Sequence, residues 1–244
     1  MDNTLYVGLS RQMTLQHALD VIANNVANVD TAGFKLESLV VEAKPQTMPA
    51  GGAGPQVVNF AYDVGLVRDF SQGSLKQTGA PFDLAVDSQG FFKVSTPNGE
   101  RYTRDGRFTL DPQGRMITQS GQAVQGEGGD IVVDPTKSTP KIALDGTVSQ
   151  DGQIVGKVAV VTFSSLSALS KDGDGLFSNT SNLQPQPSAS ANVRQGMIES
   201  SNVEPINQIT QMIAVSRAYE SVSQMMSTAA DQAQSTIDRL GRVS

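Results

Sequence analysis

The strongest constraint on this chain is a seven-residue repeat of apolar residues near its N-terminus. Two rows of positions, offset by three residues, run from Leu5 to Val29, and six of their eight residues are aliphatic. The rows are Leu5, Gln12, Leu19, Val26 and Gly8, Leu15, Ile22, Val29. Such a repeat is typical of a helix that packs along a coiled-coil-like seam. We therefore expect an N-terminal helix about 36 Å long, ended by Gly33.

A second repeat of the same length lies near the C-terminus. Its rows are Met212, Tyr219, Met226, Ala233, Leu240 and Val215, Val222, Ala229, Thr236, Val243. The apolar stripe is widened at its start by Ile206, Ile209 and Ile213. Asn202 is a favourable residue for a helix start, and Gly241 suits the end. The pattern predicts a helix from Asn202 to Leu240, about 55 Å long.

The middle of the chain has short apolar runs in place of this repeat. Between Gly73 and Gly196 the runs are separated by four turn dipeptides, Asn98-Gly99, Asp105-Gly106, Asp145-Gly146 and Asp151-Gly152. Each dipeptide is a signal for a β-hairpin. Several such signals at short spacing predict a β-barrel or β-sandwich.

These patterns divide the chain into four parts. Residues 1–35 form one helix, 36–72 a linker or extended segment, 73–196 a β-domain and 197–244 a second helix. Each helix has an apolar stripe that it cannot bury alone, so we expect the two to pair. The predicted fold class is α+β: a discontinuous α-helical coiled-coil domain from both termini, with an inserted all-β, barrel- or sandwich-like domain. The apolar surface exceeds what one pair can cover, which predicts association with other subunits.

Composition excludes several classes of function. The 244 residues have a formal net charge of −6 and include no cysteine. An acidic chain lacks the basic face that nucleic acid requires, and anionic lipid would not attract it. Without cysteine there is no disulfide and no thiolate metal site. No cleavable signal peptide is visible, and no apolar run approaches the roughly 18 residues of a membrane span, so we expect no direct membrane insertion.

No group of residues has the spacing of a catalytic, cofactor-binding or metal site. His17, the one histidine, falls opposite the seam and is expected on a solvated or contact surface. Residues 171–175 resemble half of a calcium loop but lack the further ligands. Residues 126–130 contain glycines but no lysine for a phosphate. Both segments are interpreted as turns, and we expect a non-enzymatic protein without cofactors.

Three segments resemble one known family. Residues 23–35, Ala-Asn-Asn-Val-Ala-Asn-Val-Asp-Thr-Ala-Gly-Phe-Lys, are similar to the N-terminal signature of bacterial flagellar rod and hook proteins. Residues 72–114 resemble the β-domain that these proteins share, and residues 199–220 resemble their C-terminal helix. The residues that carry the signature are Asn24, Asn25, Asn28, Thr31, Gly33, Phe34, Asn202 and Arg217.

The resemblance implies a structural subunit of the flagellar basal-body rod. It implies export by the flagellar export apparatus without a cleaved signal peptide, and a place in the periplasmic space. It also implies assembly with copies of itself and with other rod proteins, proximal and distal. The short length and residues 1–7 favour a rod protein other than the distal-rod protein, which stays as the alternative. The expected assembly interface comprises Leu5, Leu15, Leu19, Ile22, Val26, Val29, Ile206, Ile209, Ile213, Tyr219, Val222 and Met226.

Two other classes of function stay open at this point. A secreted β-domain enzyme or binding module with a coiled-coil dimerisation stem would need a catalytic cluster or an aromatic platform, and the sequence shows neither. An adaptor that only regulates assembly would be absent from purified basal bodies. For a rod subunit we further expect terminal segments that are largely unfolded before assembly, because ordering each residue costs about 1–2 kcal/mol of backbone entropy.

Overall fold

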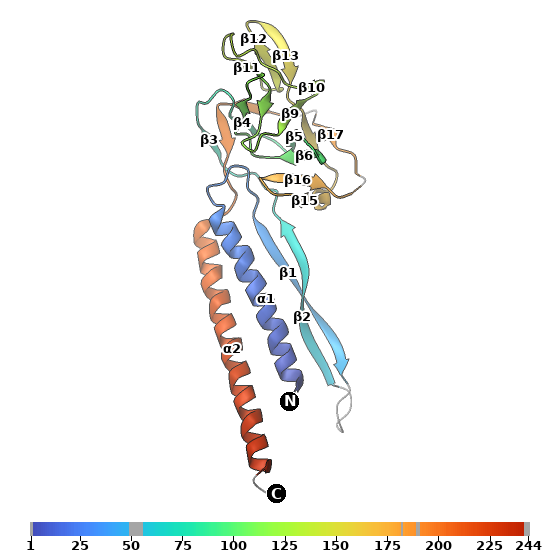
Figure 1. Cartoon of the computed structure of the whole chain (residues 1–244), viewed down its shortest axis with the longest axis vertical. Coiled ribbons are helices and arrows are strands. Elements are labelled where there is room, and N and C mark those ends of the chain that lie inside the picture. Colours follow the sequence, from blue (N-terminus) through green and yellow to red (C-terminus); the bar gives the residue numbers. More distant parts are fainter. Residues whose placement is uncertain (1, 49–55, 182, 189–190, 242–244) are drawn as a thin grey trace. The chain divides into compact units, whose positions relative to one another are not determined.

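The computed structural model describes residues 2–48, 56–181, 183–188 and 191–241. An N-terminal helix, a β-rich middle and a C-terminal helix follow one another, as predicted (Figure 1). The chain forms two compact units. The first comprises Met1–Ala27, Glu37–Asp69 and Glu204–Ser244, and the second comprises Asn28–Leu36 and Phe70–Val203. Each unit therefore combines segments that lie far apart in the sequence.

The first unit contains two long helices that pack against each other, α1 (Asp2–Ala27) and α2 (Pro205–Gly241). The helices run antiparallel, because Gln12 contacts Tyr219 while Asn25, farther along α1, contacts the earlier Gln208. The terminal helices thus pair as predicted. α2 is the longer helix and continues past the N-terminal end of α1 (Figure 1). Within the described ranges, neither helix combines the length and the apolarity needed to cross a bilayer.

The helix ends differ from the prediction. α1 ends at Ala27, well before Gly33, the residue expected to terminate it. α2 begins at Pro205, and Asn202 does not cap it. Instead, the Asn202 side-chain oxygen accepts the backbone N–H of Leu36 over 2.8 Å, within the second unit. Proline suits the first helical position because its missing N–H would have no partner there.

A long β-hairpin completes the first unit. Strands β1 (Glu37–Met48) and β2 (Gln56–Arg68) pair antiparallel along their whole lengths, with one register shift after Val40. Residues 36–72, expected as a linker or extended segment, thus contain two extended strands that pair with each other. Of the loop predicted at 45–55, residues 49–55 lie outside the described part of the chain.

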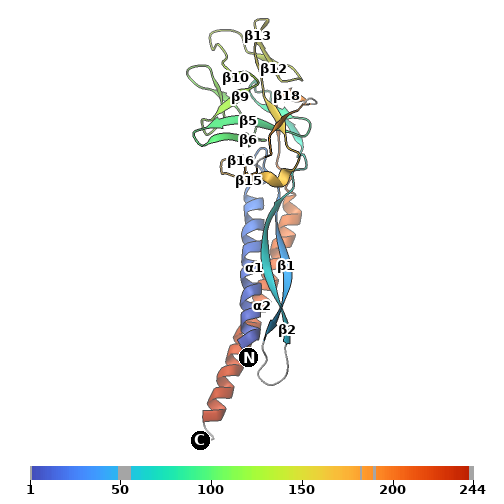
Figure 2. The same ribbon diagram turned by 90° about the vertical axis from the view of Figure 1, so that its right-hand side faces the viewer.

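A proline within β1 explains why this hairpin is difficult to predict from the sequence. Pro45 pairs with Asn59, but both strands of a two-stranded ribbon are edge strands, where proline is tolerated. A two-stranded hairpin is only marginally stable alone. Here both strands pack along α1, as Figures 1 and 2 show, and Thr14 and Val21 of α1 are buried. α1 therefore supplies the support that the hairpin lacks.

The second unit is built from short strands. Its strands and single 3-10 turn are β3 (Leu75–Gln77), β4 (Leu84–Val86), β5 (Phe91–Thr96), β6 (Gly99–Thr103), β7 (Thr109–Leu110), β8 (Met116–Ile117), β9 (Ala123–Gly126), β10 (Gly129–Asp130), β11 (Lys141–Ile142), β12 (Thr147–Gln150), β13 (Gln153–Lys157), β14 (Val160–Thr162), η1 (Leu166–Ala168), β15 (Leu169–Lys171), β16 (Leu176–Asn179), β17 (Gln186–Pro187), β18 (Val193–Gln195) and β19 (Met197–Glu199).

The largest sheet of this unit is open. Its strands follow the order β15-β16-β6-β5-β9-β8-β7, and β14 adds to β5. Strands β11, β12 and β13 form a separate three-stranded sheet, while β4 pairs with β18 and β3 with β19. Since β15 and β7 do not pair with each other among the described residues, this sheet is not closed, and the barrel form of the predicted barrel- or sandwich-like domain is not confirmed. Short strands that bend into several small sheets leave no continuous ribbon to close.

Three of the four predicted turn dipeptides join paired strands. Asp151-Gly152 links β12 to β13, and φ is 50° at Asp151 and 78° at Gly152, as a tight hairpin turn requires. Asn98-Gly99 lies at the turn from β5 to β6, with Gly99 as the first residue of β6, and Asp145-Gly146 lies between β11 and β12. Asp105-Gly106 joins no such pair. Gly106 is needed there because a Cβ would lie 1.6 Å from the carbonyl oxygen of Leu84.

Two apolar cores stabilise the second unit. The larger is mostly aliphatic, as the scarcity of aromatic residues predicts, and it surrounds fully buried residues such as Leu84, Met116 and Val148. The smaller gathers the aromatic rings of Phe91, Tyr102, Phe163 and Phe177 in edge-to-face contacts. Ring pairs of this kind add to the free energy gained from burial alone.

Candidate assembly surface and buried polar cluster

α2 exposes an apolar stripe near its N-terminal end. Ile206, Ile209 and Ile213 are 78%, 48% and 51% exposed, and their spacing places them on one face of the helix. Row residues between Met212 and Ala229, such as Val215 and Val222, are half-buried instead. Contiguous exposed aliphatic residues on a helix indicate an interaction surface. This Ile206–Ile209–Ile213 stripe is the candidate assembly surface of α2.

A second exposed stripe lies on α1. Tyr6, Leu9 and Met13 have the same spacing of three and four residues, and all three side chains are exposed. None of them belongs to the expected interface, because the seven-residue repeat assigns the apolar face of α1 to the seam alone. Their spacing is visible in the sequence, so a search for a second apolar face finds them.

The structure separates the predicted interface residues into two groups. Leu15 and Ile22 are buried, while Leu5, Leu19, Val26, Tyr219, Val222 and Met226 are half-buried, all in the first unit. Val29 is half-buried in the second unit. The three isoleucines of the α2 stripe are exposed. Most of the predicted set is therefore at least partly buried within the subunit, and a minority is open to a partner.

An open groove accompanies the seam at its α1 N-terminal end. It has a volume of about 610 Å³ and is lined mainly by apolar side chains of both helices, including Leu5, Val222, Met225 and Met226. Gly8 lies at its floor, where a Cβ would be 2.8 Å from the Met226 side chain. The absence of a side chain at Gly8 thus permits close approach of the two helices.

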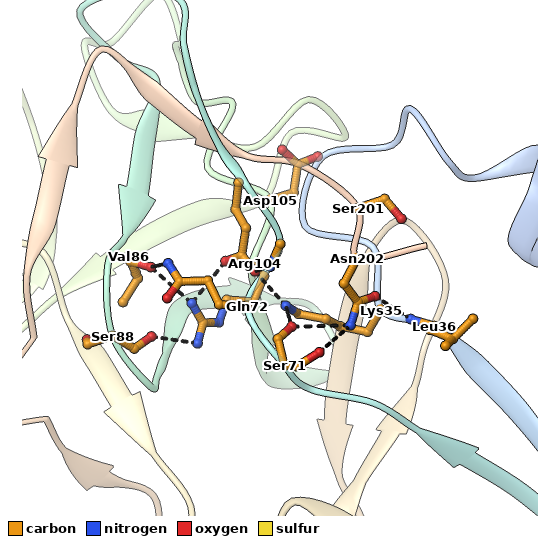
Figure 3. Close-up of polar contacts among 12 residues, drawn as sticks. Lys35, Leu36, Ser71, Gln72, Val86, Ser88, Arg104, Asp105, Ser201 and Asn202 are labelled. Atoms are coloured by element: carbon orange, nitrogen blue, oxygen red, sulfur yellow. Dashed lines mark hydrogen bonds and ion pairs between the residues drawn. The ribbon is translucent and has the colours of Figure 1, made fainter. Parts of the chain in front are cut away.

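A buried cluster of charges lies in the second unit. Glu199 accepts from Lys35 Nζ at 2.5 Å and from Arg104 at 2.9 Å, and the three side chains are almost completely buried. Arg104 also donates to the carbonyl oxygens of Val86 and Ser88 (Figure 3). Burial lowers the pKa of Arg104, and the carboxylate of Glu199 opposes this shift. Removing one member of such a cluster leaves buried charge without compensation.

The cluster joins three segments of chain. Lys35 Nζ also donates to the carbonyl oxygen of Ser71 over 2.7 Å, and the backbone N–H of Gly73 donates to Glu199 over 3.1 Å. Asn202 links the same segments, because its side-chain nitrogen donates to Ser71 while its oxygen accepts from Leu36 (Figure 3). Within the second unit, the stretches around Lys35, Ser71 and Glu199 are therefore fixed to one another.

Residues of the family signature also lie where these three segments meet. Gly33 donates its N–H to the carbonyl oxygen of Glu199 over 2.8 Å, with a φ of 69°. A Cβ on Gly33 would lie 2.4 Å from the carbonyl carbon of Arg104. Phe34 is buried, and the Lys171 ammonium group lies 4.8 Å from the centre of its ring. Position 33 therefore requires glycine for two reasons, the close approach of the Arg104 backbone and the left-handed backbone conformation.

The other signature residues have diverse surroundings. Thr31 donates its hydroxyl to the Asn28 side chain over 3.1 Å within the second unit. Asn25 is buried in the first unit and contacts both a strand and α2. Asn24 and Arg217 are exposed. The signature thus combines residues that stabilise the subunit with residues that face outward.

The residues weighed as candidates for catalysis or metal binding lie on a helix and in turns. His17 is half-buried on α1. Within residues 171–175 the connection from β15 to β16 is 172–175, and within 126–130 the turn from β9 to β10 is 127–128, so both predicted turns are confirmed. In the described part of the chain, no group of three or more histidine or acidic side chains is close enough to hold a metal ion.

Family profiles match three parts of the chain. A profile described as "Flagella basal body rod protein" matches residues 5–35, one described as "Flagellar hook protein FlgE/F/G D1 domain" matches 85–155, and one described as "Flagellar basal body rod FlgEFG protein C-terminal" matches 194–239. The matches cover α1, much of the β-rich unit and α2. The fold and its terminal helices therefore define a rod or hook protein of the bacterial flagellum.

Full-length relatives narrow this class. The flagellar basal-body rod protein FlgF of Caulobacter vibrioides (strain ATCC 19089 / CIP 103742 / CB 15) is 48% identical over 247 residues and 100% of both chains. FlgF of Mesorhizobium japonicum is 34% identical over 99% of each chain. FlgG of Bacillus subtilis (strain 168) is 32% identical over 93% of this chain and 95% of its own. The chain belongs to the family of flagellar basal-body rod proteins FlgF. It is a structural subunit of the basal-body rod, as the sequence resemblance implied.

Proposed function

We propose that the subunit polymerises into the rod through the exposed apolar faces of its terminal helices. The observation that carries this proposal is the Ile206–Ile209–Ile213 stripe, whose side chains are 48–78% exposed in the described chain. In this proposal the seam between α1 and α2 is coiled-coil-like, and neighbouring subunits pack on the faces that the seam leaves open.

α2 has little to stabilise it within one subunit. Among the α2 residues whose side-chain burial is described, Gln208 alone is buried. A long helix gains most of its stability in proteins from packing an apolar face. We therefore infer that α2 beyond its seam with α1 orders on assembly, when neighbours supply the missing contacts. An unfolded terminal segment would also suit passage through the flagellar export apparatus.

The proposed partners are copies of this chain and other rod proteins. Full-length similarity to basal-body rod proteins named FlgF and FlgG supports a shared mode of assembly with other rod components. Both the proximal-rod proteins and FlgG are candidates for the subunits next to it in a periplasmic rod. In this role the protein has no catalytic activity, binds no cofactor and does not contact nucleic acid or insert into the membrane.

Photo-cross-linking in purified basal bodies tests the proposal. A photoreactive amino acid replaces Ile213, and in a matched control it replaces Ile154, which is 75% exposed on β13 of the second unit. We expect the probe at position 213 to form products with rod subunits, identified by mass spectrometry, at several times the yield of position 154. Equal yields would contradict the proposal, and absence of the protein from basal bodies would favour the adaptor.

A further inference from the structure

The seam between α1 and α2 does not fix its own register. Apolar residues recur every seven positions on both helices, so a slide of seven residues replaces one apolar contact by another. Met212, Tyr219 and Met226 occupy equivalent positions in one row of α2. A slide of this kind displaces the helices by about 10 Å along their axis. Some other feature must therefore select one register.

A buried polar contact provides that selection. Asn25 donates to the side-chain oxygen of Gln208 over 3.1 Å, and both residues are buried. Gln208 lies in the same row of α2 as Val215 and Val222. A slide of seven residues therefore brings Val215 to the position of Gln208, and the buried amide of Asn25 loses that partner. The amide keeps its two hydrogen bonds with Glu37, but one buried N–H of Asn25 is left without an acceptor. Such a loss is costly, whereas exchange of apolar contacts is nearly neutral.

Asn25 is itself held in place by β1. Its side chain accepts the backbone N–H of Glu37 over 3.0 Å and donates to the carbonyl oxygen of Glu37 over 2.7 Å. The Glu37 carboxylate in turn accepts from Arg68 Nε over 2.7 Å, which links the two strands of the hairpin. Asn25 therefore cannot follow a sliding α2 without breaking contacts with the hairpin.

A second polar pair supports the same register. Gln12 Nε2 donates to the Tyr219 hydroxyl over 3.0 Å. A slide of seven residues in either direction replaces Tyr219 by Met212 or Met226, neither of which offers a comparable acceptor. Both polar pairs are satisfied in one register only.

We propose that the Asn25–Gln208 contact sets the register of the helix pair, and thereby the axial offset between the exposed stripes of α1 and α2. Polar residues in an otherwise apolar seam are known to specify register in coiled coils. The consequence for assembly rests on the proposed function, because only a repeating contact between subunits requires a constant offset. A register error would present the Ile206–Ile209–Ile213 stripe about 10 Å from its place opposite a neighbour.

Engineered disulfides measure the register directly, since the full-length chain has no cysteine of its own. Gly8→Cys is combined with Met226→Cys for the observed register, and with Ala233→Cys for a slide of seven residues. Met226→Ala accompanies Ala233→Cys, because a side chain at position 8 would otherwise collide with Met226 in the observed register. The purified full-length proteins are oxidised, and peptide mass spectrometry quantifies each intramolecular disulfide. With Asn25 present, we expect the 8–226 disulfide to predominate. Equal yields of the two disulfides would overturn the proposal.

Substitution of Asn25 or Gln208 then tests whether their contact causes the preference for one register. Asn25→Leu and, separately, Gln208→Leu place an apolar side chain of similar size at each position and should raise the off-register share about tenfold. Asn24→Leu is the matched control, because Asn24 is exposed on the adjacent position, and it should leave the ratio unchanged. An unchanged ratio in both variants of the pair would overturn the proposal. This readout uses purified protein, so it can succeed even where incorporation into basal bodies, the test of the proposed function, fails.

Discussion

Lys35 and Glu199 form a buried ion pair across 164 residues of sequence, with Nζ 2.5 Å from Oε1. Arg104 adds a second cation to the same carboxylate. Buried ion pairs rarely add much to stability, because desolvation offsets the attraction, but breaking one is strongly destabilising. The arrangement of the three chain segments that meet at Glu199 therefore depends on that carboxylate.

Glu199→Gln should destabilise the second unit by about 3–5 kcal/mol. The substitution keeps the shape of the side chain but leaves two buried cations, Lys35 and Arg104, without a neutralising charge. The loss in free energy of unfolding is measured by urea denaturation, followed by the near-ultraviolet circular dichroism of the tyrosines and phenylalanines. Because Tyr102 and Phe177 lie in the aromatic core of this unit, the signal reports on its folding.

Glu127→Gln is the matched control for this substitution. Glu127 pairs with Lys157, but its side chain is largely exposed to solvent. Exposed ion pairs contribute about 0–1 kcal/mol, so this variant should remain close to the unsubstituted protein. Comparable losses in the two variants would show that burial of Glu199 has no special importance.

Gly33→Ala should destabilise the protein by more than a left-handed φ alone explains. Gly79→Ala is the control, because Gly79 has a similar φ of 74° but no atom within 4 Å of the place that a Cβ would occupy. The control should lose about 1 kcal/mol. Gly33→Ala should lose about 3 kcal/mol or more, because its methyl group would collide with the backbone of Arg104. Equal thermal shifts for the two variants would contradict the close approach.

Asp134 should contribute to the pH dependence of stability. Its carboxylate accepts the Thr136 hydroxyl over 2.6 Å and the Thr136 N–H over 2.9 Å, and these bonds lower the pKa of Asp134. A carboxyl whose pKa falls on folding stabilises the protein above its unfolded pKa, near ~4, and loses this effect as the pH falls through the folded value. Thr136→Val should raise the pKa of Asp134 in an NMR titration, whereas Thr136→Ser should retain it. Identical titration curves would exclude the hydroxyl as a cause.

The helices can be predicted from the sequence because their signal is local and repetitive. Leu15 and Ile22 recur with the period of a helix, and their burial follows from that period alone. The turn at Asp151-Gly152 can likewise be predicted, because these two residue types themselves favour the positive φ that the turn requires. The resemblance of residues 23–35 to a known signature identifies the family before any contact is known.

The remaining features depend on contacts that no local pattern encodes. Glu199 is one acidic residue among 24, and its importance arises only when Lys35 and Arg104 reach it from distant segments. The β1–β2 hairpin resembles a linker in sequence because Pro45 interrupts it, and its support comes from α1. A helix cap is the commonest local role for a residue like Asn202, but a partner from another segment, Leu36, accounts for its position.

Incorporation of an Ile213→Asp variant into basal bodies is the most direct test of assembly through the terminal helices. The variant and the matched Ile154→Asp control are each produced in cells that lack the unsubstituted protein. Their amounts in purified basal bodies are then measured by quantitative mass spectrometry. The account predicts loss of incorporation for Ile213→Asp, with its second unit still folded, and near-normal incorporation for Ile154→Asp. Normal incorporation of Ile213→Asp would contradict it.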